Sequence, residues 1–262
     1  FTQDQINELL IAKAREGKTV VRLKGGDPIV FGRGAEEAAL LAEAGIEFEI
    51  VPGVTAAIAA GAYTGIMLTD RRHSSQLVLV TGREAENKQD SGIDWDLLAG
   101  FSGTIAFYMG MGNLEFITGQ LLSNGRSADT PVAVIADATL PTQRTVRATL
   151  ADVVSCCKES GIAPPAIIVI GPAARTDTAF DWFTRKPLFG KTIVVTRDAR
   201  GNADFAARII EQGGNPIEFA TMKIKPLSGA RGFLGALARL GEYDWVVFTS
   251  ANGVSVFFNC LE

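Results

Sequence analysis

The residues best suited to chemistry form a short loop, Gly25-Gly26-Asp27-Pro28, directly after a run in which apolar and polar residues alternate. Because glycine has no Cβ, Gly25 and Gly26 can adopt backbone angles that other residues disfavour, and a ligand can lie against bare main chain. Pro28 fixes its own φ and keeps Asp27 out of helical geometry, which holds the loop open. The pattern is typical of a ligand-binding loop, and it is also compatible with a plain tight turn.

The elements around this loop are those of an open α/β sheet. Residues 20–24 alternate apolar and polar side chains and predict a strand, and residues 35–44 predict a helix after the loop. Residues 47–51 predict a second strand, and the small apolar residues 56–63 predict a closely packed helix. Strand, glycine loop and helix in this order build a ligand crevice at the carboxyl ends of strands. Thr55 can cap the second helix or meet a ligand at its N-terminus, and the two roles are compatible.

The rest of the chain predicts two further α/β units. A polar segment at residues 70–76 precedes the first of these units. The strands of that unit are expected at residues 77–81, 104–109, 132–136 and 166–170, and those of the second unit at residues 192–196 and 245–248. Further helices are expected at residues 1–17, 113–123, 150–160 and 203–212. We therefore expect domains at residues 1–73, 74–175 and 189–262, with a linker at residues 176–188.

The composition excludes several function classes. A net charge of −4 and a pI near 5.2 argue against a general nucleic-acid binder. No apolar run approaches bilayer length and no signal pattern opens the chain, so we expect a cytoplasmic protein without a membrane partner. One histidine, His73, and three cysteines without a Cys-x-x-Cys pair predict no metal site.

A series of short strings then narrows the interpretation. In chain order they are VVRLKGGDP from residue 20, VFGR from 30, VPGVTA from 51, FYMG from 107, QR from 143 and PAIIVIG from 165. Together they resemble the tetrapyrrole methylases, most closely the uroporphyrinogen-III C-methyltransferases, over residues 1 to about 175. The strings VVTR from 194 and YDWVVFTSANGV from 243 resemble the opening of the uroporphyrinogen-III synthases. The methylases open with a strand and a Gly-Pro-Gly-Asp-type loop that residues 1–19 lack, so we expect a fragment without the methyltransferase N-terminus.

The resemblance implies an α/β protein with the two-lobed tetrapyrrole-methylase fold, its first lobe truncated, followed by a partial parallel α/β synthase-like domain. It implies S-adenosylmethionine as the methyl donor, and C-methylation of uroporphyrinogen III towards precorrin-2 in sirohaem and cobalamin biosynthesis by a homodimer. The residues that it places at the S-adenosylmethionine site are Gly25, Gly26, Asp27, Val30, Thr55, Ala56, Met109 and Ala138. Asp27 can instead cap its own turn and Met109 can instead be ordinary core. No catalytic residue is assigned.

The implied substrate carries many carboxylates, which arginine suits through its two-pronged geometry. The candidate arginines, each of which can also be an ordinary solvated side chain, are Arg22, Arg33, Arg71, Arg72, Arg83, Arg144 and Arg147. Three positions depart from the family's pattern: Asp70 and Arg83 stand where it has histidine, and Ala138 stands where it has glycine. Two alternatives therefore stay open, namely a catalytically incomplete chain that only binds ligand and a methylase of another tetrapyrrole.

Overall fold

The computed structural model describes residues 1–72, 74–84, 92–175, 178–196, 199–223 and 225–261. The chain divides into two compact units. The first contains residues 1–192 and 209–215, and the second contains residues 193–208 and 216–262. His73 lies outside the described residues, as do residues 176–177 of the predicted linker.

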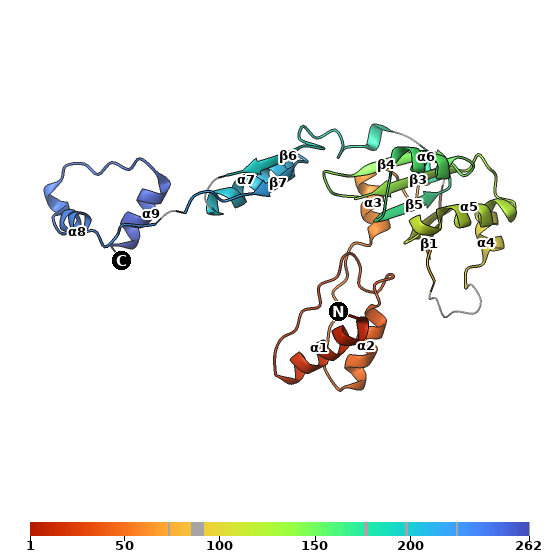
Figure 1. Ribbon diagram of the computed structural model, residues 1–262, viewed down its shortest axis with the longest axis horizontal. Helices are drawn as coiled ribbons and strands as arrows, with labels where there is room; N and C mark the ends of the chain where they lie inside the picture. Colours follow the sequence, from red (N-terminus) through yellow and green to blue (C-terminus); the bar gives the residue numbers. More distant parts are fainter. Residues whose placement is uncertain (73, 85–91, 176–177, 197–198, 224, 262) are drawn as a thin grey trace. The chain divides into compact units, whose positions relative to one another are not determined.

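The first unit is built on a five-stranded sheet with the order β1-β2-β5-β3-β4 (Figure 1). Its strands are β1 (Leu77–Thr81), β2 (Thr104–Tyr108), β3 (Pro131–Ala136), β4 (Arg144–Thr149) and β5 (Ala166–Ile170). β1 pairs in parallel with β2 and the other neighbours are antiparallel, so the sheet is mixed. The strands predicted at β1, β2, β3 and β5 are confirmed, whereas β4 was not predicted.

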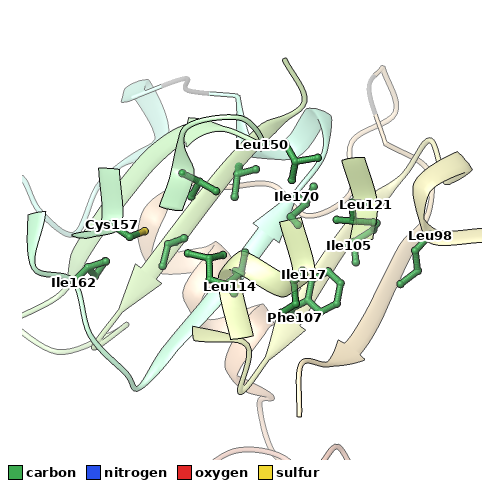
Figure 2. Close-up of a cluster of buried hydrophobic side chains, with 14 of the residues drawn as sticks. Leu98, Ile105, Phe107, Leu114, Ile117, Leu121, Leu150, Cys157, Ile162 and Ile170 are labelled. Carbon is green, nitrogen blue, oxygen red and sulfur yellow. The ribbon is translucent and has the colours of Figure 1, made fainter. Parts of the chain in front are cut away.

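Side chains alternate between the two faces of this sheet, and helices cover both faces. On one face, Ile105 and Phe107 of β2 belong to a buried cluster shown in Figure 2. The helices that contribute to this cluster are α4 (Trp95–Gly100), α5 (Leu114–Ser123) and α6 (Val153–Ser160). On the other face, Ala106 and Tyr108 pack with α3 (Ala56–Thr64). The carboxyl end of β2 therefore lies against the helix that follows Thr55.

Two helices precede α3 in the chain, α1 (Gln3–Arg15) and α2 (Gly34–Glu43). A capping box starts α1, because Thr2 Oγ1 accepts from the Gln5 N–H and the Gln5 side chain accepts from the Thr2 N–H. The helices predicted in this part of the chain are confirmed.

The strands predicted at residues 20–24 and 47–51 are wrong. Both runs have no regular secondary structure, and neither is paired with a strand in the described part of the chain. A strand needs a neighbour that satisfies its backbone donors and acceptors, and an alternating pattern alone does not supply one. Val21 and Leu23 are consequently 81% and 84% exposed.

Beyond residue 190, β6 (Thr192–Val195) and β7 (Asn215–Glu218) form a two-stranded sheet. The helices of this stretch are α7 (Ala199–Glu211), α8 (Arg231–Ala238) and α9 (Ala251–Asn259). Short 3₁₀ helices along the chain are η1 (Met111–Asn113), η2 (Pro172–Ala174), η3 (Thr178–Phe180) and η4 (Leu240–Glu242).

The strand predicted at residues 245–248 is wrong, since this run is unpaired within the described ranges and Trp245 is 85% exposed. No helix among the described residues has the length and apolarity to cross a membrane.

Candidate functional site

The glycine loop (residues 25–33) folds back on itself before α2. The Gly34 N–H donates to the Pro28 carbonyl over 3.1 Å, and a Cβ on Gly34 would lie 2.3 Å from that oxygen. Gly26 has a φ of +104°, which a residue with a Cβ rarely adopts, as the sequence argument requires. Gly25 needs no such φ, but a Cβ there would meet no atom within 4 Å, so its main chain is open to a ligand.

Asp27 joins the glycine loop to the loop before α3. Its Oδ1 accepts from the Ile29 N–H and its Oδ2 accepts from the Gly53 N–H, both over 3.0 Å. The Gly53 bond, followed by the Ile29 bond, lowers the pKa of the Asp27 carboxyl below its ordinary value. The turn-capping role is therefore present in the structure, and Asp27 also fixes the distance between two loops.

The same two loops touch through their backbones. A Cβ on Gly53 would lie 2.5 Å from the Gly26 carbonyl oxygen, and a Cβ on Gly26 would lie 3.6 Å from the Val54 carbonyl oxygen and 3.9 Å from the Ala56 nitrogen. The predicted site residues on these loops, Gly26, Asp27, Thr55 and Ala56, are thus brought together.

Tyr108 connects this pair of loops to the sheet. Its hydroxyl lies 2.7 Å from the Thr55 Oγ1 and accepts the Ala57 N–H over 3.0 Å. The ring of Phe31 packs against the ring of Tyr108 with centroids 4.9 Å apart. Thr55 is the N-cap residue of α3 but makes no side-chain cap bond, so the capping interpretation of its hydroxyl is wrong and Tyr108 takes the cap's role. Sequence reasoning missed this tyrosine, although the string FYMG contains it.

Met109 and Ala138 follow β2 and β3, which run in the same direction because both are antiparallel to β5. They therefore lie at the same edge of the sheet. Met109 has a φ of +55° and is 53% exposed, so the core interpretation of its side chain is wrong. Val30 and Ala138 are half-buried and pack on the cluster that includes Tyr108.

Most described candidate arginines have protein partners. Arg22 pairs with Glu37 and Arg33 pairs with Glu36. Arg144 donates to the carbonyls of Ser160 and Gly161, and Arg147 donates to the Thr64 carbonyl over 3.2 Å. Arg72 Nε lies 3.6 Å from Asp70 Oδ1, and Arg71 and Arg72 line a polar cavity of about 240 Å³. The other residues around this cavity are Ser74, Ser75, Gln76, Ser102 and Gly103.

These features can be compared with known proteins. The sequence pattern of the Tetrapyrrole (Corrin/Porphyrin) Methylases matches residues 1–154. The chain belongs to the tetrapyrrole methylase family. The pattern of uroporphyrinogen-III synthase HemD matches residues 203–262, so a HemD-like segment follows the methylase part. Both matches confirm the resemblance stated from the sequence.

The family member from Bacillus subtilis named uroporphyrinogen-III C-methyltransferase is 40% identical over 259 residues, which are 99% of this chain and 53% of that protein. The S-adenosyl-L-methionine-dependent uroporphyrinogen III methyltransferase of Methanosarcina barkeri is 51% identical over 171 residues, 65% of this chain and 67% of that protein. Among solved structures, the Thermus thermophilus uroporphyrin-III C-methyl transferase complexed with S-adenyl homocysteine superimposes with a TM-score of 0.57 at 35% identity, covering 66% of this chain and 74% of that chain. Although nearly the whole chain is matched by the Bacillus subtilis protein, it spans only about half the length of that relative.

Proposed function

We propose that the protein to which this chain belongs transfers the methyl group of S-adenosylmethionine to a ring carbon of uroporphyrinogen III, towards precorrin-2. The observation that carries the proposal is the meeting of the two loops, at residues 25–27 and 53–56, beside Tyr108 and the exposed Met109. Family membership and the names of the relatives support the same donor and substrate.

The residues present fit such a donor. The bare main chain of Gly25 admits close approach, and the exposed Met109 side chain offers a soft apolar contact. Asp27 retains acceptor capacity on its two oxygens beyond the backbone bonds that it accepts. S-adenosylmethionine supplies an activated methyl group, so the protein's contribution is to hold donor and acceptor in line. We assign the donor site to Gly25, Gly26, Asp27, Val30, Thr55, Ala56, Met109 and Ala138.

The finer parts of the proposal concern the whole protein. The polar cavity of Arg71 and Arg72 includes Gln76 and Gly103, which precede β1 and β2, whereas the proposed donor site lies at the carboxyl ends of β2 and β3. We therefore assign neither arginine to the carboxylates of the tetrapyrrole. We propose domains at residues 1–73, 74–175 and 189–262 with a linker at 176–188, in a cytoplasmic homodimer that serves sirohaem and cobalamin synthesis. The HemD match supports a parent protein that also carries uroporphyrinogen-III synthase activity.

The test is titration calorimetry with S-adenosylhomocysteine, followed by incubation with methyl-labelled S-adenosylmethionine and uroporphyrinogen III. Binding together with label in the tetrapyrrole supports the proposal. Binding without transfer of label to any tetrapyrrole supports the ligand-binding alternative, and transfer to a different tetrapyrrole supports a methylase of another substrate. An absence of binding overturns the donor site.

A further inference from the structure

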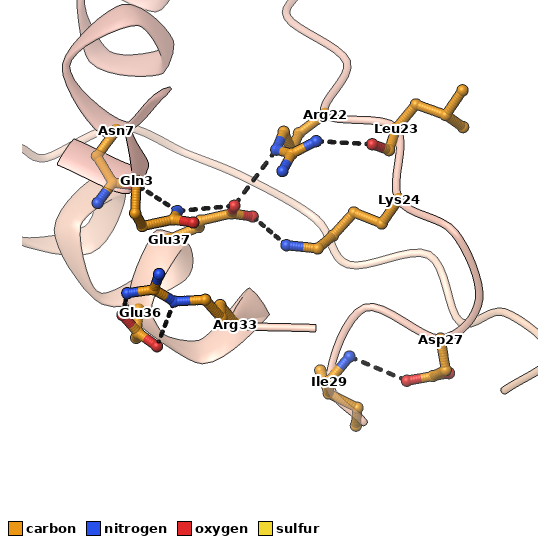
Figure 3. A network of polar contacts seen from close by, with 10 residues as sticks. All are labelled: Gln3, Asn7, Arg22, Leu23, Lys24, Asp27, Ile29, Arg33, Glu36 and Glu37. Atoms are coloured by element: carbon orange, nitrogen blue, oxygen red, sulfur yellow. Dashed lines mark hydrogen bonds and ion pairs between the residues drawn. The ribbon is translucent and has the colours of Figure 1, made fainter. Parts of the chain in front are cut away.

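Glu37 is a buried carboxylate that the proposed chemistry does not use. It lies in the first turn of α2 and is 5% exposed. Figure 3 shows the donors that converge on it. Lys24 Nζ lies 2.6 Å from its Oε2, and its Oε1 accepts from Gln3 Nε2 over 3.0 Å and from Arg22 Nε over 3.3 Å.

These four residues, Gln3, Arg22, Lys24 and Glu37, form the Glu37 network. Lys24 directly precedes Gly25, where the glycine loop begins, and Glu37 follows Arg33, where the loop ends. The Lys24–Glu37 ion pair therefore connects the two ends of the loop. Gln3 extends the connection to α1.

The Lys24–Glu37 ion pair is shielded from solvent, in contrast to the neighbouring Arg33–Glu36 pair. The side chains of Lys24 and Glu37 are 12% and 6% exposed, whereas those of the adjacent Arg33–Glu36 pair are 55% and 54% exposed. A shielded pair interacts strongly, and loss of one partner leaves an uncompensated charge, while an exposed pair contributes little. Burial by itself raises the pKa of the Glu37 carboxyl, but its bonds to Lys24 and Gln3 hold that pKa below its ordinary value.

We infer that Glu37 is a positioning residue for the donor site: through Lys24 it holds the glycine loop in the shape that presents Gly25 and Gly26 to the ligand. This inference rests on the proposed function, since it concerns the affinity of the same site. It assigns to Glu37 no contact with the ligand. Its effect is transmitted through its ion pair with Lys24, whose backbone leads directly into the loop.

The test compares Glu37→Gln with the matched control Glu36→Gln, which removes a charge one residue earlier on the same helix. The affinity for S-adenosylhomocysteine is measured by calorimetry and the melting temperature by circular dichroism. We expect Glu37→Gln to weaken binding about ten- to a hundredfold, which is within the usual range for coupling between a distant group and a binding site, and Glu36→Gln to leave it within about twofold.

The outcomes separate this inference from the proposed function. A lower melting temperature for Glu37→Gln with unchanged affinity means that Glu37 has only a structural role, and this result overturns the inference. An equal loss of affinity in Glu36→Gln also overturns it. If the unmodified chain binds no S-adenosylhomocysteine, the proposed function fails, and hydrogen exchange without ligand still decides the inference. Faster exchange of the amides of residues 25–33 in Glu37→Gln than in Glu36→Gln supports it, and equal exchange overturns it.

Discussion

The hydroxyl of Tyr108, at the carboxyl end of β2, lies 2.7 Å from the hydroxyl of Thr55, which precedes α3. Because the Tyr108 hydroxyl also accepts the Ala57 N–H, a single buried oxygen fixes the start of α3 against the sheet. The position of the loop at residues 53–56, and hence of Thr55 and Ala56 in the proposed donor site, depends on this contact.

We predict that Tyr108→Phe lowers the free energy of unfolding by about 1–3 kcal/mol, because it leaves the buried Ala57 N–H and Thr55 hydroxyl without this partner. Urea denaturation measures the change. The control is Tyr63→Phe, which removes a hydroxyl from a half-buried ring packed on Trp182 and Phe183. Equal losses in the two variants would contradict the assignment to Tyr108.

Asp27 predicts a pH dependence of stability. Its folded-state pKa is lowered by the backbone bonds from Gly53 and Ile29, so these bonds stabilise the fold fully above the unfolded pKa of about 3.9. As the pH falls through the folded pKa, the carboxyl is protonated and that stabilisation is lost. We expect the stability difference between the unmodified chain and Asp27→Asn to shrink between about pH 4 and the lower folded pKa. Denaturant unfolding at a series of pH values measures it, and a difference independent of pH would refute the role.

The sequence predicted the sheet where strands are buried on both faces. The continuous apolar runs at β3 and β5, of six and five residues, are short for a helix and therefore favour buried strands, and both strands were found. β4 was missed because it lies at the end of the sheet and carries Arg144 and Arg147, so its composition resembles a loop. The runs at residues 20–24 and 245–248 have good strand composition, yet pairing is a tertiary property that local pattern cannot report.

The residue types of the site could be predicted from the sequence, whereas the contacts between them could not. The glycines, with Asp27 and Pro28, indicated a loop whose bare main chain a ligand can approach, and the structure places that loop against Gly53, which the sequence did not predict. Which atom caps α3 could not be read from Thr55, because the partner Tyr108 lies 53 residues further along the chain. Glu37 was not singled out from the sequence, because its burial depends on how α1 and the run before Gly25 pack.

Gly53, which lies at the loop contact, and Gly25, around which an added Cβ would find open space, predict different effects of alanine. Gly53→Ala should lower the free energy of unfolding by about 1–3 kcal/mol, because its Cβ would collide with the Gly26 carbonyl. Gly25→Ala should leave stability within about 0.5 kcal/mol, since its Cβ meets no atom, yet weaken S-adenosylhomocysteine binding by filling the open main chain. Gly112→Ala, whose Cβ also meets no atom within 4 Å, is the control for both measurements. Normal ligand affinity in Gly25→Ala would remove Gly25 from the donor site.

Ala138 stands where the family's pattern has glycine. Ala138 is half-buried on the cluster that contains Tyr108, between two residues with positive φ, Asp137 at +49° and Thr139 at +75°. If its methyl group restricts the donor site, Ala138→Gly should bind S-adenosylhomocysteine several-fold more tightly while the free energy of unfolding falls by about 0.5–1 kcal/mol, the usual cost of added backbone freedom. Ala173→Gly is the matched control, because Ala173 packs on the same cluster. Ala173→Gly should show a similar loss of stability without the gain in affinity. A gain in affinity in both variants, or in neither, would show that the Ala138 methyl does not restrict the ligand.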